Sequence, residues 1–250
     1  MKKLLQNELL KLRYNRMSIV FAVLMVGCGA FTAVIPRFPG QITTFDYGVM
    51  ASMRYLNDAG GLSAVLMTGI AAGLIAQEFN NRTIHNALSC GVSRRKYFFT
   101  KTCLYMASCF LIHLVTLLLF TVIRSAIFGF FPPYYRYRNL IIVTIAVHLG
   151  DAAVLFAYMS VFLLFAILFR NPAAVIFSGV AYYYLESWLP MIHGISFYGA
   201  PFYAIAGISP LVISGRVLSA EYAALTLPCI ATGIVFLSLA YLIFMKKDIN

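Results

Sequence analysis

Residues 140–169 read LIIVTIAVHLGDAAVLFAYMSVFLLFAILF and form the longest apolar run in the chain. Asp151 is the one charged residue in this run if His148 is counted as neutral. A helix needs about 20 mostly apolar residues to cross the hydrocarbon core of a bilayer. The run therefore predicts a membrane-spanning helix that is long enough to tilt or to project beyond the bilayer.

The composition of the whole chain agrees with a membrane location. Of its 250 residues, 62% are hydrophobic and 11% are charged, whereas about a quarter of the residues of an ordinary soluble domain are charged. So few charges cannot cover a water-facing globule, which excludes a soluble enzyme, a disordered tail and a nucleic-acid-binding domain. The net charge of +11 is then first a signal of membrane orientation.

Further apolar runs bring the prediction to six membrane-spanning helices. They cover residues 17–35, 60–76, 102–123, 173–184 and 223–245. The second and fourth runs in this list are shorter than a usual span. The sequence predicts an all-α membrane protein in which residues 1–250 form a single transmembrane domain.

Lysine and arginine residues set the orientation of these helices, because short basic loops resist translocation. If both chain ends lie inside the cell, the inner segments hold 13 of the 19 basic residues and the outer segments hold the other 6. We therefore predict a multi-pass protein of the bacterial cell membrane with N-in and C-in topology.

Two segments are expected to contact the membrane without crossing it. Residues 1–16 have leucines on one helical face and Lys3, Asn7 and Lys11 on the other, which predicts an amphipathic helix in the inner interface; a frayed basic tail is the alternative. Residues 186–222 are apolar but broken by proline and glycine, which predicts a re-entrant element between the fifth and sixth spans.

The segment between the second and third spans reads QEFNNRTIHNALSCGVSRRKYFFTK, residues 77–101. Asn81 or Thr83 is suited to cap a short helix, Gly91 to end it, and Ser93 to cap the next helix. The short helix would have one apolar face, made of Ile84, Ala87 and Leu88. The sequence predicts a two-turn helix on the cytoplasmic surface that is joined at both ends to membrane spans.

This loop resembles the first inner loop of the ABC-2 family of ABC-transporter permeases. The residues that match the family pattern are Glu78, Phe79, Thr83, Leu88, Ser93, Arg94 and Lys101. Two positions depart from it: Arg82 stands where the family usually has glycine, and Gly91 stands where it often has proline. The glycine makes the exit from the helix less rigid.

The resemblance implies a non-catalytic half-transporter. Two permease subunits, which we expect to be identical, would associate in the lipid with two copies of a cytoplasmic ABC ATPase, and no nucleic acid is implied. The chain has no G-x-x-x-x-G-K-[ST] motif, so ATP and magnesium would bind to the partner ATPase, with no cofactor in this chain. The implied ATPase-coupling residues are Glu78, Phe79, Arg82, Thr83, Ile84, Ala87, Leu88, Ser93, Arg94 and Lys101.

Permeases of this size are similar to two-component bacterial exporters of lantibiotics, phenol-soluble modulins and other amphipathic or antimicrobial peptides, and to drug exporters. We therefore expect ATP-driven export of such a compound from the cell or the membrane. Glu78 is expected to form an ion pair with Arg82, with Arg94 or with the partner ATPase.

His148 and Asp151 are spaced to share one face of the fourth span. Ionisable groups inside a membrane are costly and are often functional. They are compatible with a proton relay, a cation contact to the cargo or a structural hydrogen bond. Arg124 is expected to reach the headgroups or to pair with Asp151. The five cysteines and the other polar residues show no metal-type spacing, so neither a metal site nor a catalytic site is predicted.

Two other functions compete with the permease reading. The first is an ion-coupled secondary transporter that uses His148 and Asp151, although the inverted repeats typical of that class are not evident. The second is an intramembrane enzyme, but the sequence has neither a Gly-x-Ser-Gly nor an HExxH motif.

Overall fold

The computed structural model describes residues 6, 8, 10–12, 14–35, 43, 46–131, 140–193, 204, 208, 211 and 219–246, and it contains no strand among them. The helices are α2 (Arg16–Val34), α3 (Gly48–Met53), α4 (Tyr55–Ala71), the π-helical turn η2 (Ala72–Ala76), α5 (Gln77–Asn80), α6 (Thr83–Ser89), α7 (Arg94–Phe128), α8 (Leu140–Phe169), α9 (Pro172–His193) and α11 (Ala220–Lys246). The protein is therefore all-helical over these residues, as its sequence predicts.

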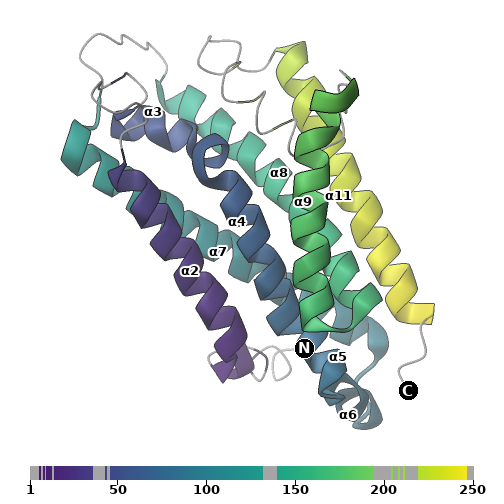
Figure 1. Cartoon of the computed structure of the whole chain (residues 1–250). Coiled ribbons are helices and arrows are strands. Elements are labelled where there is room, and N and C mark those ends of the chain that lie inside the picture. The colour runs from purple at the N-terminus through teal and green to yellow at the C-terminus, as the bar shows by residue number, and fades with distance from the viewer. Residues whose placement is uncertain are drawn as a thin grey trace.

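Four helical segments are long and apolar enough to cross a membrane: α2, α7, Ile142–Phe169 of α8, and α11. They correspond to the first, third, fourth and sixth predicted spans. Helix α7 is longer than the predicted run at both ends, which places its first turns at the end of the molecule where α6 lies (Figure 1).

The remaining two predicted spans fall in helices that also belong to the bundle. Residues 60–76 lie in α4 and η2, and α5 continues from η2 without a break. Residues 173–184 lie in α9, which extends to His193 and so into the segment 186–222 assigned from sequence to a re-entrant element. Most of the rest of that segment lies outside the described residues.

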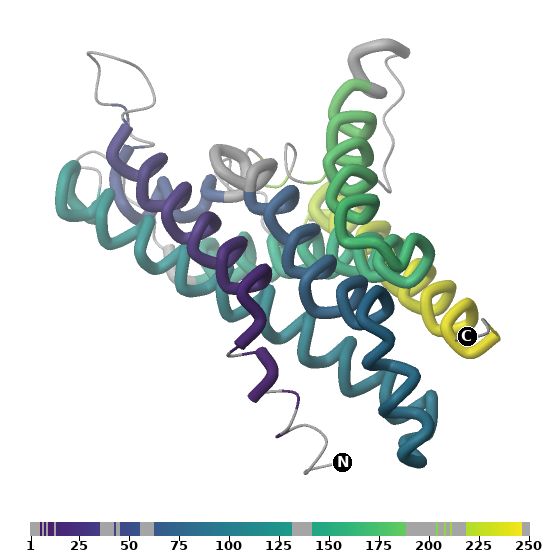
Figure 2. The backbone as a smooth tube through the Cα atoms, turned by 60° about the horizontal axis from the view of Figure 1, so that its bottom comes forward, coloured from purple at the N-terminus to yellow at the C-terminus, as the bar shows by residue number. Residues whose placement is uncertain are grey.

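Helix α8 is the central helix of the bundle. Val147, Val154, Tyr158 and Phe162 of this helix are fully buried. It packs against α4, α9 and α11, while α2 packs against α4 and α7 (Figure 2). The apolar side chains on the outer faces of α2, α7 and α11 remain exposed, as expected for surfaces that meet hydrocarbon.

Glycines let α2 approach α4 and η2 closely. A Cβ atom added to Gly69 of α4 would overlap the Phe21 ring of α2, and one added to Gly73 of η2 would lie 2.6 Å from the hydroxyl oxygen of Ser18. The Asn15 side chain caps α2 by accepting a hydrogen bond from the Ser18 amide, and its Nδ2 donates to the Gly73 carbonyl at 2.7 Å. The start of α2 is thereby fixed against the π-helical turn.

A buried ion pair joins α7 to the connection before α3. Figure 1 shows α3 at the opposite end of the molecule from α6. Arg124 of α7 lies 2.8 Å from the Asp46 carboxylate, and it also donates to the carbonyls of Thr32 and Ile35 at the end of α2. The prediction that Arg124 reaches the headgroups or pairs with Asp151 is therefore wrong. Its partner, Asp46, lies in the connection between α2 and α3, and helical spacing within α7 cannot predict a contact with that connection.

Candidate functional site

The predicted coupling residues gather at one end of the bundle, in α5, α6 and the first turns of α7. Figure 1 shows α6 beyond the ends of the long helices, at the same end as the start of α2 and the end of α11. The short helix extends from Thr83 to Ser89. Both of its connections are tight, so its position is tied directly to α5 and α7.

The turn into α6 is made by Arg82, which has a φ of 57° in the left-handed region. No side chain caps the start of α6 among the described residues, so the expected cap by Asn81 or Thr83 is wrong. The Thr83 hydroxyl instead donates to the Glu78 carbonyl at 3.1 Å, which connects α6 back to α5. Glycine adopts this conformation most readily, so Arg82 stands where glycine would be less strained.

The turn out of α6 follows the Schellman pattern. The Gly91 amide donates to the Leu88 carbonyl at 3.0 Å, and the Val92 amide donates to the Ala87 carbonyl at 3.3 Å. Gly91 has a φ of 86°, which explains why a glycine is placed there. The Ser93 side chain then accepts a hydrogen bond from the Lys96 amide and caps α7.

The two faces of α6 differ in character. Ile84 is 1% exposed, and Ala87 and Leu88 pack partly buried against the core, so the apolar face points toward the protein's own body. The opposite face is polar and exposed, and consists of Arg82, His85, Asn86 and Ser89. The predicted coupling residues did not include His85, Asn86 and Ser89. Helical spacing could have identified them, because it places these three residues together on the face opposite Ile84 and Leu88.

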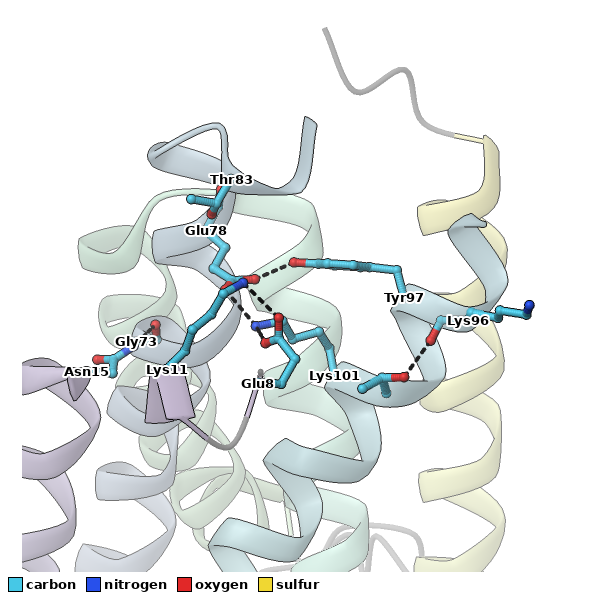
Figure 3. Close-up of polar contacts among 10 residues, drawn as sticks. Glu8, Lys11, Asn15, Gly73, Glu78, Thr83, Lys96, Tyr97 and Lys101 are labelled. Carbon is cyan, nitrogen blue, oxygen red and sulfur yellow. Dashed lines mark hydrogen bonds and ion pairs between the residues drawn. The ribbon is translucent and has the colours of Figure 1, made fainter. Parts of the chain in front are cut away.

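Glu78 belongs to a cluster of charges that links three parts of the chain (Figure 3). Its carboxylate lies 2.6 Å from the Lys101 ammonium of α7 and 3.6 Å from that of Lys11 in the N-terminal segment, and it accepts a hydrogen bond from the Tyr97 hydroxyl. Lys101 also forms an ion pair with Glu8, which is 2% exposed. The expected pairing of Glu78 with Arg82 or Arg94 is not the one observed.

Glu8 and Lys11 are held in their charged forms by their partners. Burial by itself would raise the pKa of Glu8, but the charges and hydrogen bonds of Lys101 and Lys11 outweigh this effect and lower that pKa below its ordinary value of 4.5. Burial would likewise lower the pKa of Lys11, but the hydrogen bond with Glu8 and the charge of Glu78 raise it above 10.5. Opposite charges therefore hold the N-terminal segment against α5 and α7 over a wide pH range.

Other predicted coupling residues contact the end of α11. Arg94 donates to the Met245 carbonyl at 3.2 Å, and the Phe79 ring lies edge-on to Phe244 at 6.2 Å between ring centroids. Arg170, which follows α8, also lies over the Phe79 ring, with its guanidinium carbon 5.3 Å from the ring centroid. The two helices that flank α6 are therefore in contact with α11, and α5 also contacts the residue that follows α8.

His148 and Asp151 lie in α8, within the span and apart from this cluster. His148 Nδ1 is 3.5 Å from Asp151 Oδ2. Both residues line a cavity, and His113 of α7 lines it with them. Sequence spacing did not group His113 with this pair, because His113 belongs to another helix. No group of three or more potential metal-ligating side chains converges within the described residues.

Sequence reasoning missed Glu8, Lys11 and Tyr97 as parts of the site. Glu8 carried one available signal: it is the one acidic residue in a basic amphipathic segment of 16 residues. Such a carboxylate in a segment that lies against the membrane surface requires a basic partner. The sequence could not identify Lys101 as that partner.

Comparison with known proteins assigns the family. No curated protein matches the chain. The family model described as ABC-2 family transporter protein matches residues 4–187, which include the N-terminal segment, α6 and the buried charge cluster. The chain therefore belongs to the ABC-2 transporter family, as a multi-pass membrane permease of an ABC transporter.

Proposed function

We propose that this permease is a non-catalytic exporter subunit driven by a separate cytoplasmic ATPase that docks on the exposed face of α6. The observation that carries the proposal is the form of α6 itself. It is a short helix beyond the ends of the long helices, buried on its apolar face and exposed through Arg82, His85, Asn86 and Ser89. A polar helix surface backed by a packed core suits a rigid contact with a soluble partner.

The connections of α6 explain how movement at this contact would reach the membrane. The Thr83–Glu78 hydrogen bond joins α6 to α5, and the Schellman turn joins it to α7. Glu78 and Lys101 then join α5 to α7 through their ion pair. Closure of the ATPase around ATP would displace α6, and these contacts would pass the displacement to α4 and α7.

The proposed topology has six spans with both chain ends inside the cell. Four of these spans are the helices that are long and apolar enough to cross a membrane. The other two would be α4 together with η2, and α9. The distribution of basic residues supports this orientation. The complete transporter would contain two identical permeases in a bacterial cell membrane and two ATPase subunits, which bind ATP and magnesium.

The proposed cargo is an amphipathic or antimicrobial peptide or drug, moved outward. Exposed aromatic and aliphatic side chains on the membrane-facing helices, such as Phe177 and Leu111, support entry of cargo from the bilayer. ATP-driven clearance of such a compound from proteoliposomes that contain both subunits tests the cargo class.

Native cysteines provide a test of the docking surface. Cys90 ends α6 and is exposed, whereas Cys103 is exposed on the side of α7. A membrane-impermeant maleimide should label Cys90 in inside-out vesicles but not in right-side-out vesicles, and bound ATPase should protect it. The variant Cys103→Ser should behave like the wild type, and Cys90→Ser should lose the protected label.

Labelling of Cys90 from outside the cell would overturn the topology and with it the docking proposal. If the ATPase leaves the labelling of Cys90 unchanged, docking at α6 is overturned but the topology is not. The partner ATPase is identified independently by purifying the solubilised permease and testing the copurifying protein for ATP hydrolysis.

A further inference from the structure

A cavity of about 310 Å³ lies between α7 and α8, away from α6. Three ionisable side chains line it: His113 from α7, and His148 and Asp151 from α8. The other lining residues are apolar, and Leu114 and Leu117 are among them. A largely apolar cavity with a few converging polar groups is typical of a small-molecule site.

The polar groups in this cavity lack hydrogen-bond partners within the described part of the chain. Asp151 is 5% exposed and His113 is 7% exposed. Asp151 Oδ2, His113 Nδ1 and His148 Nδ1 each have no hydrogen bond there, and His148 Nδ1 lies 3.5 Å from Asp151 Oδ2. No lysine or arginine in the described residues forms an ion pair with Asp151, unlike Asp46, Glu8 and Glu78.

A buried carboxylate that has no lysine or arginine partner and only an imidazole 3.5 Å away is costly inside a membrane protein. A ligand that brings a positive charge and N–H donors would remove that cost. A primary ammonium group has three N–H donors, and an imidazole nitrogen accepts a hydrogen bond when the other ring nitrogen carries the proton. The cavity presents one carboxylate oxygen and two imidazole nitrogens that make no hydrogen bond within the described residues. The chemistry of the cavity therefore matches an amine.

The cavity also has a path to the bilayer. Leu111 and Leu114 line it and are 62% and 50% exposed on the outer surface of α7. The apolar wall of the cavity is thus continuous with the surface that meets lipid. A hydrocarbon tail attached to the amine would lie along these leucines without entering water.

We propose that this cavity binds the primary ammonium group of an amphiphile dissolved in the membrane, with Asp151 as counter-ion, and with His113 and His148 as hydrogen-bond acceptors. The inference rests on the proposed export function, which it deepens by defining the cargo as a cationic amphiphile. The occupant is the free amphiphile, and occupation by an uncharged lipid chain is the competing outcome.

Equilibrium binding of radiolabelled dodecylamine to the full-length permease tests the proposal without the ATPase. The protein is placed in nanodiscs of zwitterionic lipid, and binding to empty nanodiscs is subtracted. We expect saturable binding that dodecanol does not compete for, and weaker competition by dodecyltrimethylammonium, which has no N–H donor. Asp151→Asn should weaken dodecylamine binding about tenfold or more.

A matched pair of variants tests the position of the site even if Asp151→Asn fails to fold. Leu114→Trp fills the cavity and should abolish saturable binding. Leu118→Trp places the same side chain one turn away, at a residue that is 57% exposed and does not line the cavity, and should leave binding unchanged. Size-exclusion profiles establish that both variants are folded.

Equal competition by dodecanol, or unchanged binding in Leu114→Trp, would overturn the inference. These outcomes would leave ATPase docking at α6 intact, because docking is measured by protection of Cys90. Conversely, if the permease binds dodecylamine but the ATPase does not protect Cys90 from maleimide, the docking proposal alone is contradicted.

Discussion

At the scale of single residues, the charge cluster at the α6 end of the molecule brings together two carboxylates and a nearly buried lysine. Lys101 lies between Glu8 and Glu78, and its side chain is 8% exposed. A buried charge is tolerated when it is closely paired, and removing one partner leaves the other uncompensated. The cluster therefore holds the N-terminal segment, α5 and α7 together only while its charges balance.

The variant Glu8→Gln should lower the melting temperature near neutral pH, because Lys101 loses one carboxylate partner. The pKa of Glu8 is lowered from 4.5 in the folded protein, so its ionised form stabilises the fold above pH 4.5, and this contribution is lost as the pH falls through the lowered pKa. Thermal unfolding at a series of pH values should therefore show a difference between wild type and variant that shrinks in acid. A difference that grows in acid would contradict the pairing.

The variant Lys101→Met should cost about 3 kcal/mol of unfolding free energy, because Glu8 and Glu78 then keep only Lys11, whose side chain is half exposed, as a basic partner. Unfolding by SDS in mixed micelles measures this loss. The control is the triple variant with Glu8→Gln and Glu78→Gln added, which should recover most of the stability. A triple variant less stable than Lys101→Met would show that charge balance is not the cause.

At the scale of elements, α6 depends on its turns more than on its length. Seven residues form too short a helix to be stable alone. Its Schellman turn at Gly91, the Ser93 cap of α7 and the burial of Ile84 supply the missing stability. Because these contacts are at the C-terminal end of α6 and on its apolar face, the polar face remains exposed.

The variant Gly91→Ala should destabilise the end of α6 by about 1 kcal/mol, because alanine is strained at a φ of 86°. No atom lies within 4 Å of the added methyl group, so the effect isolates backbone strain. Hydrogen–deuterium exchange of the α6 amides measures the loss. Gly27→Ala, in the middle of α2 with equally open space, is the matched control and should leave exchange in α6 unchanged.

At the scale of the whole molecule, helix packing and two groups of buried ion pairs fix the relative positions of the spans. The cluster around Lys101 joins segments at the α6 end, and the Arg124–Asp46 pair joins α7 to the connection after α2 at the other end. Between them, α2 meets α4 through small residues, since packing in a membrane relies on close backbone approach.

The variant Gly69→Ala should separate α2 from α4 and cost about 1–3 kcal/mol, because the new methyl group would overlap the Phe21 ring. The melting temperature in detergent measures the effect. A second substitution, Phe21→Ala, should restore part of the loss by making space. If Gly69→Ala alone matches the wild type, the close contact does not determine how these helices pack.

The sequence predicted the features that depend on local chemistry. The apolar runs located α2, α7, α8 and α11, because the length and polarity of a membrane span are properties of consecutive residues. Gly91 and Ser93 correctly indicated the end of α6 and the start of α7, because these caps involve residues within one turn. The start of α6 was mispredicted, since Arg82 rather than a capping side chain makes that turn.

The tertiary structure alone decided which distant residues meet. Helical periodicity relates a residue to those three or four positions away, so it grouped His148 with Asp151. It could not pair Glu78 with Lys101 or Arg124 with Asp46, or place His113 in the cavity that His148 lines, because these positions depend on how separate helices are placed and rotated. The sequence thus determined a helical membrane permease with a short helix between two of its spans, whereas packing determined which face of that helix is exposed and which charges connect it to the spans.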